Sequence, residues 1–267
     1  MGVLNVTPDS FSDGGLYLDT AAAVDHAKEM AAAGADIVDV GGESTRPGAE
    51  PVSEPEELER VIPVVERIAT AGGPRVSIDT RKAGVAEAAL QAGARIVNDV
   101  SAFRASPEMA GLVAGAGAHC CLMHMLGDDP RKMQDDPRYD DVVSEVKAFL
   151  EGRLSFAVAE GVPEEHVWLD PGIGFGKTVA HNLELIRRLD EIVAIGRPVA
   201  IGTSRKSYLG QLTGRSEAQR VAGTVATNVL AYERGARIFR VHDVAPAVDA
   251  LRVAGATVTG EWTIPTS

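Results

Sequence analysis

The 267-residue chain carries 26 basic and 38 acidic residues, a formal net charge of −12, and 45% of its residues are hydrophobic. That hydrophobic content can fill a sizeable core and excludes wholesale disorder. The acidic balance argues against a nucleic-acid partner, which needs a broad basic face, but a few local cations still suffice to hold a small anion. No apolar run reaches the roughly 18 residues of a membrane-spanning helix, so no membrane partner is expected.

The cysteines and the chain start bear on location. Cys120 and Cys121 are adjacent and cannot staple a core, which favours a reducing, cytoplasmic setting. Met1 leads directly into an apolar strand, so no signal peptide is expected. This abrupt start points to a trimmed chain or to a start codon farther upstream.

Short β-branched runs alternate with amphipathic stretches rich in Ala, Leu and Glu along the whole chain. Strands are predicted near residues 1–6, 35–41, 75–79, 95–100, 118–124, 166–170, 198–202 and 237–242. Helices are predicted near residues 20–34, 54–71, 82–92, 107–116, 140–161, 180–195, 216–234 and 245–255. The absence of a linker or composition shift favours an α/β fold, a (β/α)8 TIM barrel formed by residues 1–267 as a single domain. A doubly wound open sheet is the alternative.

A polar residue stands at or just beyond the end of nearly every predicted strand. These residues are Asn5, Asp39, Asp79, Asn98, Asp99, His124, Asp170, Ser204, Lys206, Arg240 and His242. Catalytic residues of such barrels lie at the carboxyl ends of the strands and in the loops that follow. Strand capping explains some of these residues but hardly all, so we expect an enzyme site for small anionic molecules at this rim.

The last strand and the loop before it predict an anion site. Arg240 and His242 alternate with Phe239 and Val241, so both basic side chains point to one face of the strand. Barrels commonly bind phosphate after strands 7 and 8, and the arginine fork matches phosphate oxygens. Residues 203–206 add hydroxyls and a lysine charge. The alternative is an ion pair with Asp243, which is less favoured for Arg240 than for His242.

Asp79, Asn98 and Asp170 come from three different strands. Carboxylates paired with an amide can read the edge of a flat heterocycle, because they accept from ring N–H groups while the amide donates to a carbonyl. The same carboxylates also suit a metal ion. The spacing does not separate these two interpretations.

Two further motifs are rejected, and two loops are retained as lids. Residues 172–178 are one residue too short for a nucleotide P-loop. His119, Cys120, Cys121 and His124 lie within one short strand whose alternation sends them to opposite faces, so packing is favoured over a zinc site. The glycine-rich segments 7–15 and 41–48 are predicted to be lids above the barrel.

In order along nearly the whole chain, the residues are similar to the signature segments of the dihydropteroate synthase family. The matching segments are residues 1–15, 39–48, 77–80, 98–101, 122–125, 170–177, 204–206 and 240–243. The resemblance implies condensation of 6-hydroxymethyl-7,8-dihydropterin pyrophosphate with p-aminobenzoate, a step of folate synthesis that sulfonamides inhibit. It also implies a homodimer. The one departure is the missing segment before the first strand, which predicts a less well plugged barrel bottom.

The resemblance also implies residue roles. The pterin would be bound by Asp79, Asn98, Asp170 and Lys206, with Phe175 nearby. The pyrophosphate would meet Thr45, Arg240 and His242, and Asn5 would contact the pyrophosphate and its Mg²⁺. The p-aminobenzoate pocket would be shaped by Phe11, Thr45, Pro47 and Ser204. Within this set, catalytic roles are expected for Asp79, Asp170, Lys206 and Arg240.

The chemistry of the residues agrees with this assignment. Arg240, His242 and Mg²⁺ would meet the charge of a departing pyrophosphate, and Asp79 and Asp170 would stabilise a pterin-methylene cation in an SN1-like step. Two rivals are a corrinoid-dependent methyltransferase that binds a methylated folate and a silent paralogue that binds pterin without condensing it. The first has no pyrophosphate to hold, and the second should have lost lid or cation residues.

Overall fold

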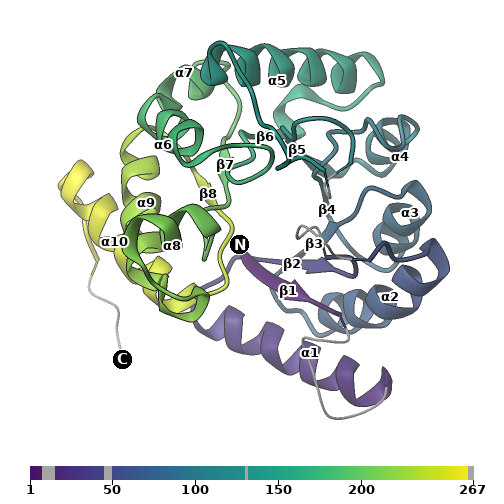
Figure 1. Cartoon of the computed structure of the whole chain (residues 1–267). Coiled ribbons are helices and arrows are strands. Elements are labelled where there is room, and N and C mark those ends of the chain that lie inside the picture. The colour runs from purple at the N-terminus through teal and green to yellow at the C-terminus, as the bar shows by residue number, and fades with distance from the viewer. Residues whose placement is uncertain (8–15, 45–49, 130–131, 264–267) are drawn as a thin grey trace.

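The computed structural model describes residues 1–7, 16–44, 50–129 and 132–263, and the strands form the inner wall of a barrel (Figure 1). The strands are β1 (Gly2–Asn5), β2 (Ile37–Gly41), β3 (Arg75–Asp79), β4 (Ile96–Asp99), β5 (His119–Met123), β6 (Val167–Asp170), β7 (Ala200–Ile201) and β8 (Ile238–Phe239). The α-helices are α1 (Leu16–Ala32), α2 (Glu54–Thr70), α3 (Ala83–Gln91), α4 (Met109–Ala116), α5 (Val142–Ala159), α6 (Val179–Arg187), α7 (Leu189–Val193), α8 (Ser207–Thr213), α9 (Val221–Glu233) and α10 (Val244–Thr259). Two 3-10 turns, η2 (Glu164–His166) and η3 (Glu217–Gln219), complete these elements.

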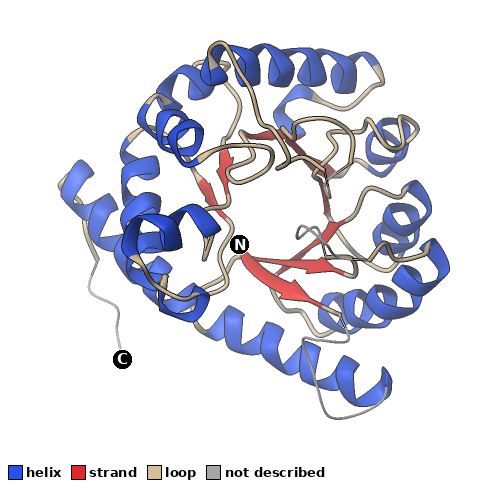
Figure 2. Cartoon of the chain, viewed as in Figure 1, coloured by secondary structure: helices blue, strands red, loops and turns tan. Residues whose placement is uncertain are grey.

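All strands run parallel and close into a ring. Strands β1 to β6 pair in sequence order, and β7 pairs with β8. The bridges Leu169–Val199 and Gly2–Val241 join the two sheets, and Val241 N donates to Met1 O at 2.9 Å. The helices surround this ring on the outside (Figure 2). The structure therefore confirms the predicted (β/α)8 barrel rather than an open sheet.

The inside of the barrel has an apolar layer below a polar one. The apolar layer contains the buried cluster of Ile37, Ile96, Cys121, Trp168 and Ala200, against which Met1 and Ile238 pack. Two positions farther along their strands, on the same face, stand Asp39, Asn98, Asp170 and Arg240. The apolar layer thus fills the barrel interior below the polar layer and leaves polar side chains at the carboxyl ends of the strands.

The predicted helices are largely correct, with three corrections. The pattern at 180–195 divides at Arg188 into α6 and α7, and the pattern at 216–234 divides into η3 and α9. Helix α8 lies between β7 and α9 and is missing from the predicted helices, because its seven residues include Gly210 and are too short to show a periodicity. None of the helices within residues 16–44, 50–129 and 132–263 is long and apolar enough to span a bilayer.

The connection from β6 to α6 passes close beneath the preceding connection. Gly172 has φ +68°, and a Cβ added there would lie 1.8 Å from the carbonyl oxygen of His124. The backbone of this connection therefore needs glycine for its conformation and also for its close approach.

We expect the Gly172→Ala variant to lower the free energy of unfolding by at least about 3 kcal/mol, since steric overlap adds to the left-handed backbone strain. Gly214→Ala is the matched control, because Gly214 has φ +69° and nothing within 4 Å of an added Cβ. The control should lose about 1 kcal/mol from strain alone. Urea denaturation followed by circular dichroism measures both variants, and equal losses would contradict the argument from the loop contact.

Candidate active site

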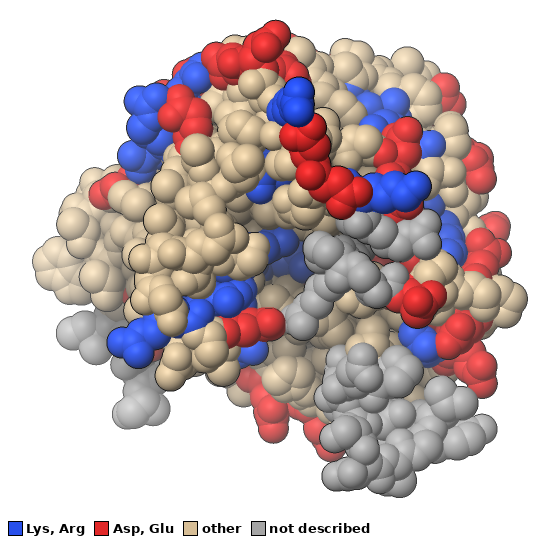
Figure 3. All heavy atoms as spheres, in the orientation of Figure 1, with Lys and Arg blue, Asp and Glu red and all other residues tan. Residues whose placement is uncertain are grey.

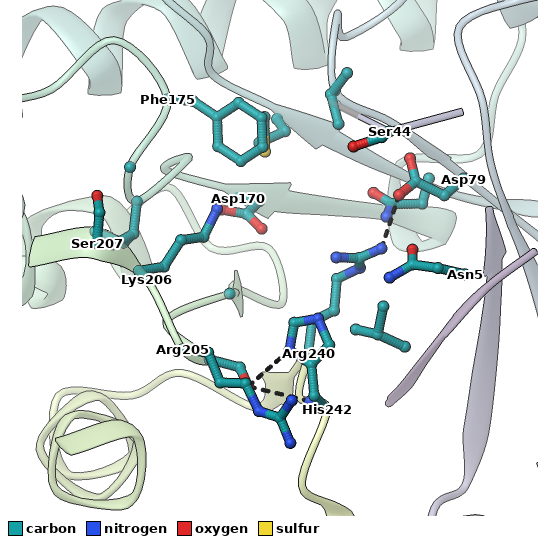
Figure 4. A pocket seen from close by; sticks show the side chains of 18 of the residues that line it. Asn5, Ser44, Asp79, Asp170, Phe175, Arg205, Lys206, Ser207, Arg240 and His242 are labelled. Carbon is teal, nitrogen blue, oxygen red and sulfur yellow. Dashed lines mark hydrogen bonds and ion pairs between the residues drawn. The ribbon is translucent and has the colours of Figure 1, made fainter. Parts of the chain in front are cut away.

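A cavity of about 750 Å³ opens at the carboxyl ends of the strands. The predicted site residues that line it are Asn5, Asp79, Asn98, Asp170, Phe175, Ser204, Lys206, Arg240 and His242. They come from the strands β1, β3, β4 and β6 and from the segments after β6, β7 and β8, and Figure 4 shows several of them pointing into one space. Lys and Arg side chains are visible deep in the hollow of the surface, although the chain is acidic overall (Figure 3). Phe11, Thr45 and Pro47 lie outside the described residues.

An ion network around Arg240 forms the floor of the cavity. Arg240 Nε lies 2.6 Å from Asp39 Oδ2, and a terminal guanidinium nitrogen lies 2.7 Å from Asp79 Oδ2. Asn98 Nδ2 donates to the same Asp39 oxygen at 2.9 Å. Asp39 is completely buried and was predicted only as a rim residue, whereas here it holds Arg240 from below. Asp243, the alternative partner considered for Arg240, instead binds Arg205.

Burial governs the protonation of this network. It raises the pKa of Asp79 to about 7, an effect that Arg240 opposes and that the neighbouring Asp39 reinforces. Burial also disfavours the charge of Arg240, but the carboxylates of Asp39 and Asp79 outweigh it and raise the pKa of the guanidinium above its ordinary value. Arg240 therefore stays charged at neutral pH, whereas Asp79 gains or loses its proton close to neutral pH.

Asp170, Lys206 and Phe175 form the opposite wall. Asp170 Oδ1 accepts from the backbone N–H of Gly172 at 2.7 Å, and Lys206 Nζ lies 4.1 Å from the centre of the Phe175 ring. Burial raises the pKa of Asp170, while the Gly172 N–H and the Lys206 charge oppose the increase. Lys206 thus combines a contact with an aromatic face and an attraction to a carboxylate (Figure 4).

A set of contacts joins the loop after β7 to the end of β8. Ser204 Oγ lies 3.1 Å from His242 N and 3.0 Å from His242 Nδ1. Arg205 makes a two-point contact with Asp243, at 2.9 and 2.5 Å. Arg205 has φ +57°, and Thr224 Oγ1 accepts from its N–H at 3.1 Å. Because this turn is fastened in place, Ser204 and Lys206 both face the cavity.

The arrangement provides the groups that recognition of a flat heterocycle needs. Asp79, Asn98 and Asp170 line one cavity, yet within the described part of the chain no group of three or more His, Cys, Asp and Glu side chains can hold a metal ion. The carboxylates and the amide instead provide acceptors and donors for the edge of a planar ring. Asn5 still contributes an amide oxygen, a ligand type that Mg²⁺ accepts when phosphate and water complete its shell.

Besides Asp39 beneath the floor, two more predicted rim residues, Asp99 and His124, lie outside the cavity. Asp99 accepts from the backbone N–H groups of Ser101 and Phe103 at 2.7 and 2.8 Å and so caps a turn. His124 is buried behind the site, where its Nδ1 lies 2.9 Å from Lys177 Nζ. Asp99 thus supports a turn and His124 contacts Lys177, and neither side chain faces the cavity. Cys120 and Cys121 are free and buried, consistent with packing rather than with a zinc site.

Other cavity-lining residues were not predicted. They include Ser44, Gln134, Arg205, Ser207 and Arg220. Arg205 and Ser207 flank Lys206 in sequence, so their neighbourhood was a usable signal. Gln134 and Arg220 come from long connections that carry no strand-end pattern, and only the folded chain brings them to the rim.

Known proteins share this chain's sequence and fold. The profile of the family described as pterin binding enzyme matches residues 1–242. A dihydropteroate synthase of Mycobacterium leprae is 51% identical over 262 residues, which cover 96% of this chain and 92% of the relative. The Yersinia pestis dihydropteroate synthase, solved with a sulfonamide drug complex, has 46% identity and a TM-score of 0.91 over 97% of this chain and 94% of its own. The Xanthomonas albilineans enzyme in complex with 7,8-dihydropteroate has 45% identity and a TM-score of 0.87, over 99% and 94%.

Proposed function

The chain belongs to the pterin-binding enzyme family, and we propose that it is a dihydropteroate synthase, a transferase of folate synthesis. It condenses 6-hydroxymethyl-7,8-dihydropterin pyrophosphate with p-aminobenzoate and releases pyrophosphate. The observation that carries this proposal is the presence of a ring-reading set and an anion-binding set in one cavity. The first set is Asp79, Asn98 and Asp170, and the second is Arg240, His242 and Lys206.

The pterin edge meets the first set. Ionised Asp79 and Asp170 accept from ring N–H and amino groups, and Asn98 offers both a donor and an acceptor. Asn98 also donates to Asp39 at 2.9 Å, which fixes the orientation of its amide. Lys206 donates to a ring acceptor from its place beside Phe175. This complementarity selects a flat heterocycle with donors and acceptors along one edge.

The pyrophosphate meets the cationic set. Arg240 is held by Asp39 and Asp79, so its fork is oriented before the substrate arrives. His242 is oriented by Ser204 in the same way. Asn5 would hold Mg²⁺ together with the phosphate oxygens, and the ion would supply charge neutralisation. Phe11, Thr45 and Pro47 stay predicted contacts of the p-aminobenzoate and pyrophosphate.

The order of bond changes is SN1-like. The bond from the pterin methylene carbon to the pyrophosphate oxygen breaks first, and its electron pair leaves with the pyrophosphate. Asp79 and Asp170 stabilise the resulting cation, whose charge spreads into the ring. The neutral amine of p-aminobenzoate then attacks the methylene carbon and releases a proton. An aryl amine is nucleophilic without a strong base, in keeping with a cavity whose lining offers carboxylates and one histidine.

The setting of the enzyme is also part of the proposal. Cys120 and Cys121 are free thiols in a buried strand, which fits a reducing cytoplasm. Exposed apolar side chains on α9 and α10 and just beyond α10 favour a homodimer through this face; they are Leu230, Val253, Val258 and Trp262. A sulfonamide resembles p-aminobenzoate and is expected to compete for its place, as a sulfonamide complex exists for the Yersinia pestis enzyme.

Incubation of the purified chain with the pterin pyrophosphate, Mg²⁺ and p-aminobenzoate should release pyrophosphate and form 7,8-dihydropteroate in equal amounts. Sulfonamide should raise the KM for p-aminobenzoate without changing kcat. Binding of pterin without pyrophosphate release would identify the silent paralogue. Methyl transfer from a methylated folate to a corrinoid would identify the other rival, and either result would refute the synthase.

The raised pKa of Asp79 predicts a pH dependence of pterin binding. Affinity for pteroic acid should fall about tenfold per pH unit below about pH 7, because protonated Asp79 no longer accepts from the ring. Asp79→Asn should abolish this acidic limb and weaken binding at pH 8. The same shift acts oppositely on folding: a raised carboxyl pKa adds stability below its ordinary value near 4 that is lost as pH rises through about 7. Calorimetric titrations from pH 5.5 to 8 test the binding claim, and an identical acidic limb in the variant would contradict it.

The dimer proposal predicts a shift from dimer to monomer when a charge is placed on the α10 face. Wild-type protein should elute with twice the protomer mass in light-scattering chromatography, and Val253→Asp should move it toward the monomer, since burying an unpaired charge is costly. Val158→Asp on α5 is the matched control, because Val158 is also exposed at its helix surface. A monomeric wild type, or equal effects of both substitutions, would refute this face as the interface.

A further inference from the structure

Lys177 is a buried lysine that does not line the cavity. It stands just before α6 with only 4% of its surface exposed. Its ammonium donates to the carbonyl oxygen of Phe175 at 3.0 Å and lies 2.9 Å from His124 Nδ1. A lysine is rarely so buried, because desolvating its charge is costly. The enzyme keeps it directly behind the wall that carries Phe175.

The loop that carries Phe175 is fastened at successive backbone groups. Gln134 donates to Gly174 O, and Tyr139 Oη donates to Gly176 O at 2.9 Å. Gly174 N donates to Asn182 Oδ1 at 2.7 Å. Lys177 supplies the charged donor of this set, at the carbonyl of the residue whose ring enters the cavity. The loop therefore has neutral tethers on both sides of a charged one.

Lys177 is linked to the cavity wall through Phe175, the residue whose carbonyl it binds. The Phe175 ring lies beside the Lys206 ammonium, 4.1 Å from its centre, and both line the cavity (Figure 4). A movement of the Phe175 backbone would shift the ring and the preferred position of Lys206 together. A contact outside the cavity thus sets the geometry inside it.

The surroundings leave Lys177 close to losing its charge. Burial lowers the pKa of Lys177 to about 7; Asp170 opposes this decrease, and the Lys206 charge adds to it. Burial, with Lys177 and Arg104, lowers the pKa of His124 to about 2, so its ring is a neutral acceptor. Tyr139, which donates to the carbonyl of Gly176 in the same loop, stays a neutral donor because burial raises its pKa. Lys177 is therefore the group here whose charge changes near neutral pH.

We propose that Lys177 is a positioning residue for pterin binding: its ammonium fixes the Phe175 backbone and, through the aromatic ring, the position of Lys206. The role rests on the proposed function, since it concerns the wall against which the pterin lies. It predicts that loss of the Lys177 charge weakens pterin binding while p-aminobenzoate binding changes little.

The test compares Lys177→Met with Tyr139→Phe, which removes a neutral tether from the neighbouring carbonyl and changes no charge. Lys177→Met should raise the Kd for pteroic acid and the KM for the pterin pyrophosphate about tenfold, the worth of a charged hydrogen bond. The KM for p-aminobenzoate should change less than about twofold, and Tyr139→Phe should change pteroic acid binding less than about threefold.

The pH profile separates positioning from simple packing. In the wild type, pteroic acid affinity should decline above about pH 7 as Lys177 becomes neutral. Lys177→Met should lack this alkaline limb, and Asp79→Asn should keep it. Lys177→Gln replaces the Met variant if the latter does not fold, as judged by circular dichroism.

An alkaline limb retained in the folded Lys177 variant would overturn the proposal, and so would equal weakening by Lys177→Met and Tyr139→Phe with unchanged profiles. Pteroic acid binding needs no turnover. A wild type that binds pteroic acid but makes no dihydropteroate therefore refutes the synthase activity and leaves the role of Lys177 measurable.

Discussion

The buried contact between Asp39 and Arg240 is the constraint on which the site depends. Asp39 is completely enclosed above the apolar layer of the barrel, so its charge must be compensated by a cation from inside the ring. Arg240 reaches it from the opposite end of the chain at 2.6 Å and directs one terminal nitrogen toward Asp79 at 2.7 Å. The last strand can satisfy both carboxylates only if the barrel is closed. The anion site is therefore assembled only when the barrel closes.

The same contact explains how an acidic protein holds a pyrophosphate. The chain carries a net charge of −12, yet carboxylates inside the barrel fix Arg240 at the cavity floor and Asp170 attracts Lys206 at its wall. A guanidinium oriented in advance loses little freedom when an anion arrives. The carboxylates therefore orient the cations that, in the proposed reaction, receive the leaving group, and in that proposal they also face the ring from which the group departs.

Strand alternation predicted much of this site, and contacts made by closure lay beyond it. The pattern around Arg240 and His242 placed both side chains in the barrel mouth, and Asp79 followed from its position at a strand end. The partner of Arg240 is 201 residues distant, so nothing local in the sequence identified Asp39 as that partner. His124 shared the strand-end pattern but lies behind the wall, where its ring contacts Lys177 and Phe149. Alternation along a strand predicts toward which face of the strand a side chain points. Contacts between loops that are distant in the sequence determine which groups surround that side chain.

The two walls of the cavity place opposite demands on protonation. In the proposed mode of binding, Asp79 reads the ring as a carboxylate and Lys177 holds Phe175 as an ammonium, and burial moves both pKa values toward 7 from opposite sides. Each group needs water excluded, because only a dry site gives its hydrogen bonds their full strength. The exclusion of water strengthens these hydrogen bonds. It also moves the pKa values of Asp79 and Lys177 to about 7, where each group is close to losing its charge. Arg240 opposes this effect at one wall and Asp170 at the other, so the central ions keep the groups that flank them charged. A substitution among these central ions should therefore disturb both walls, even where it removes no contact to the substrate.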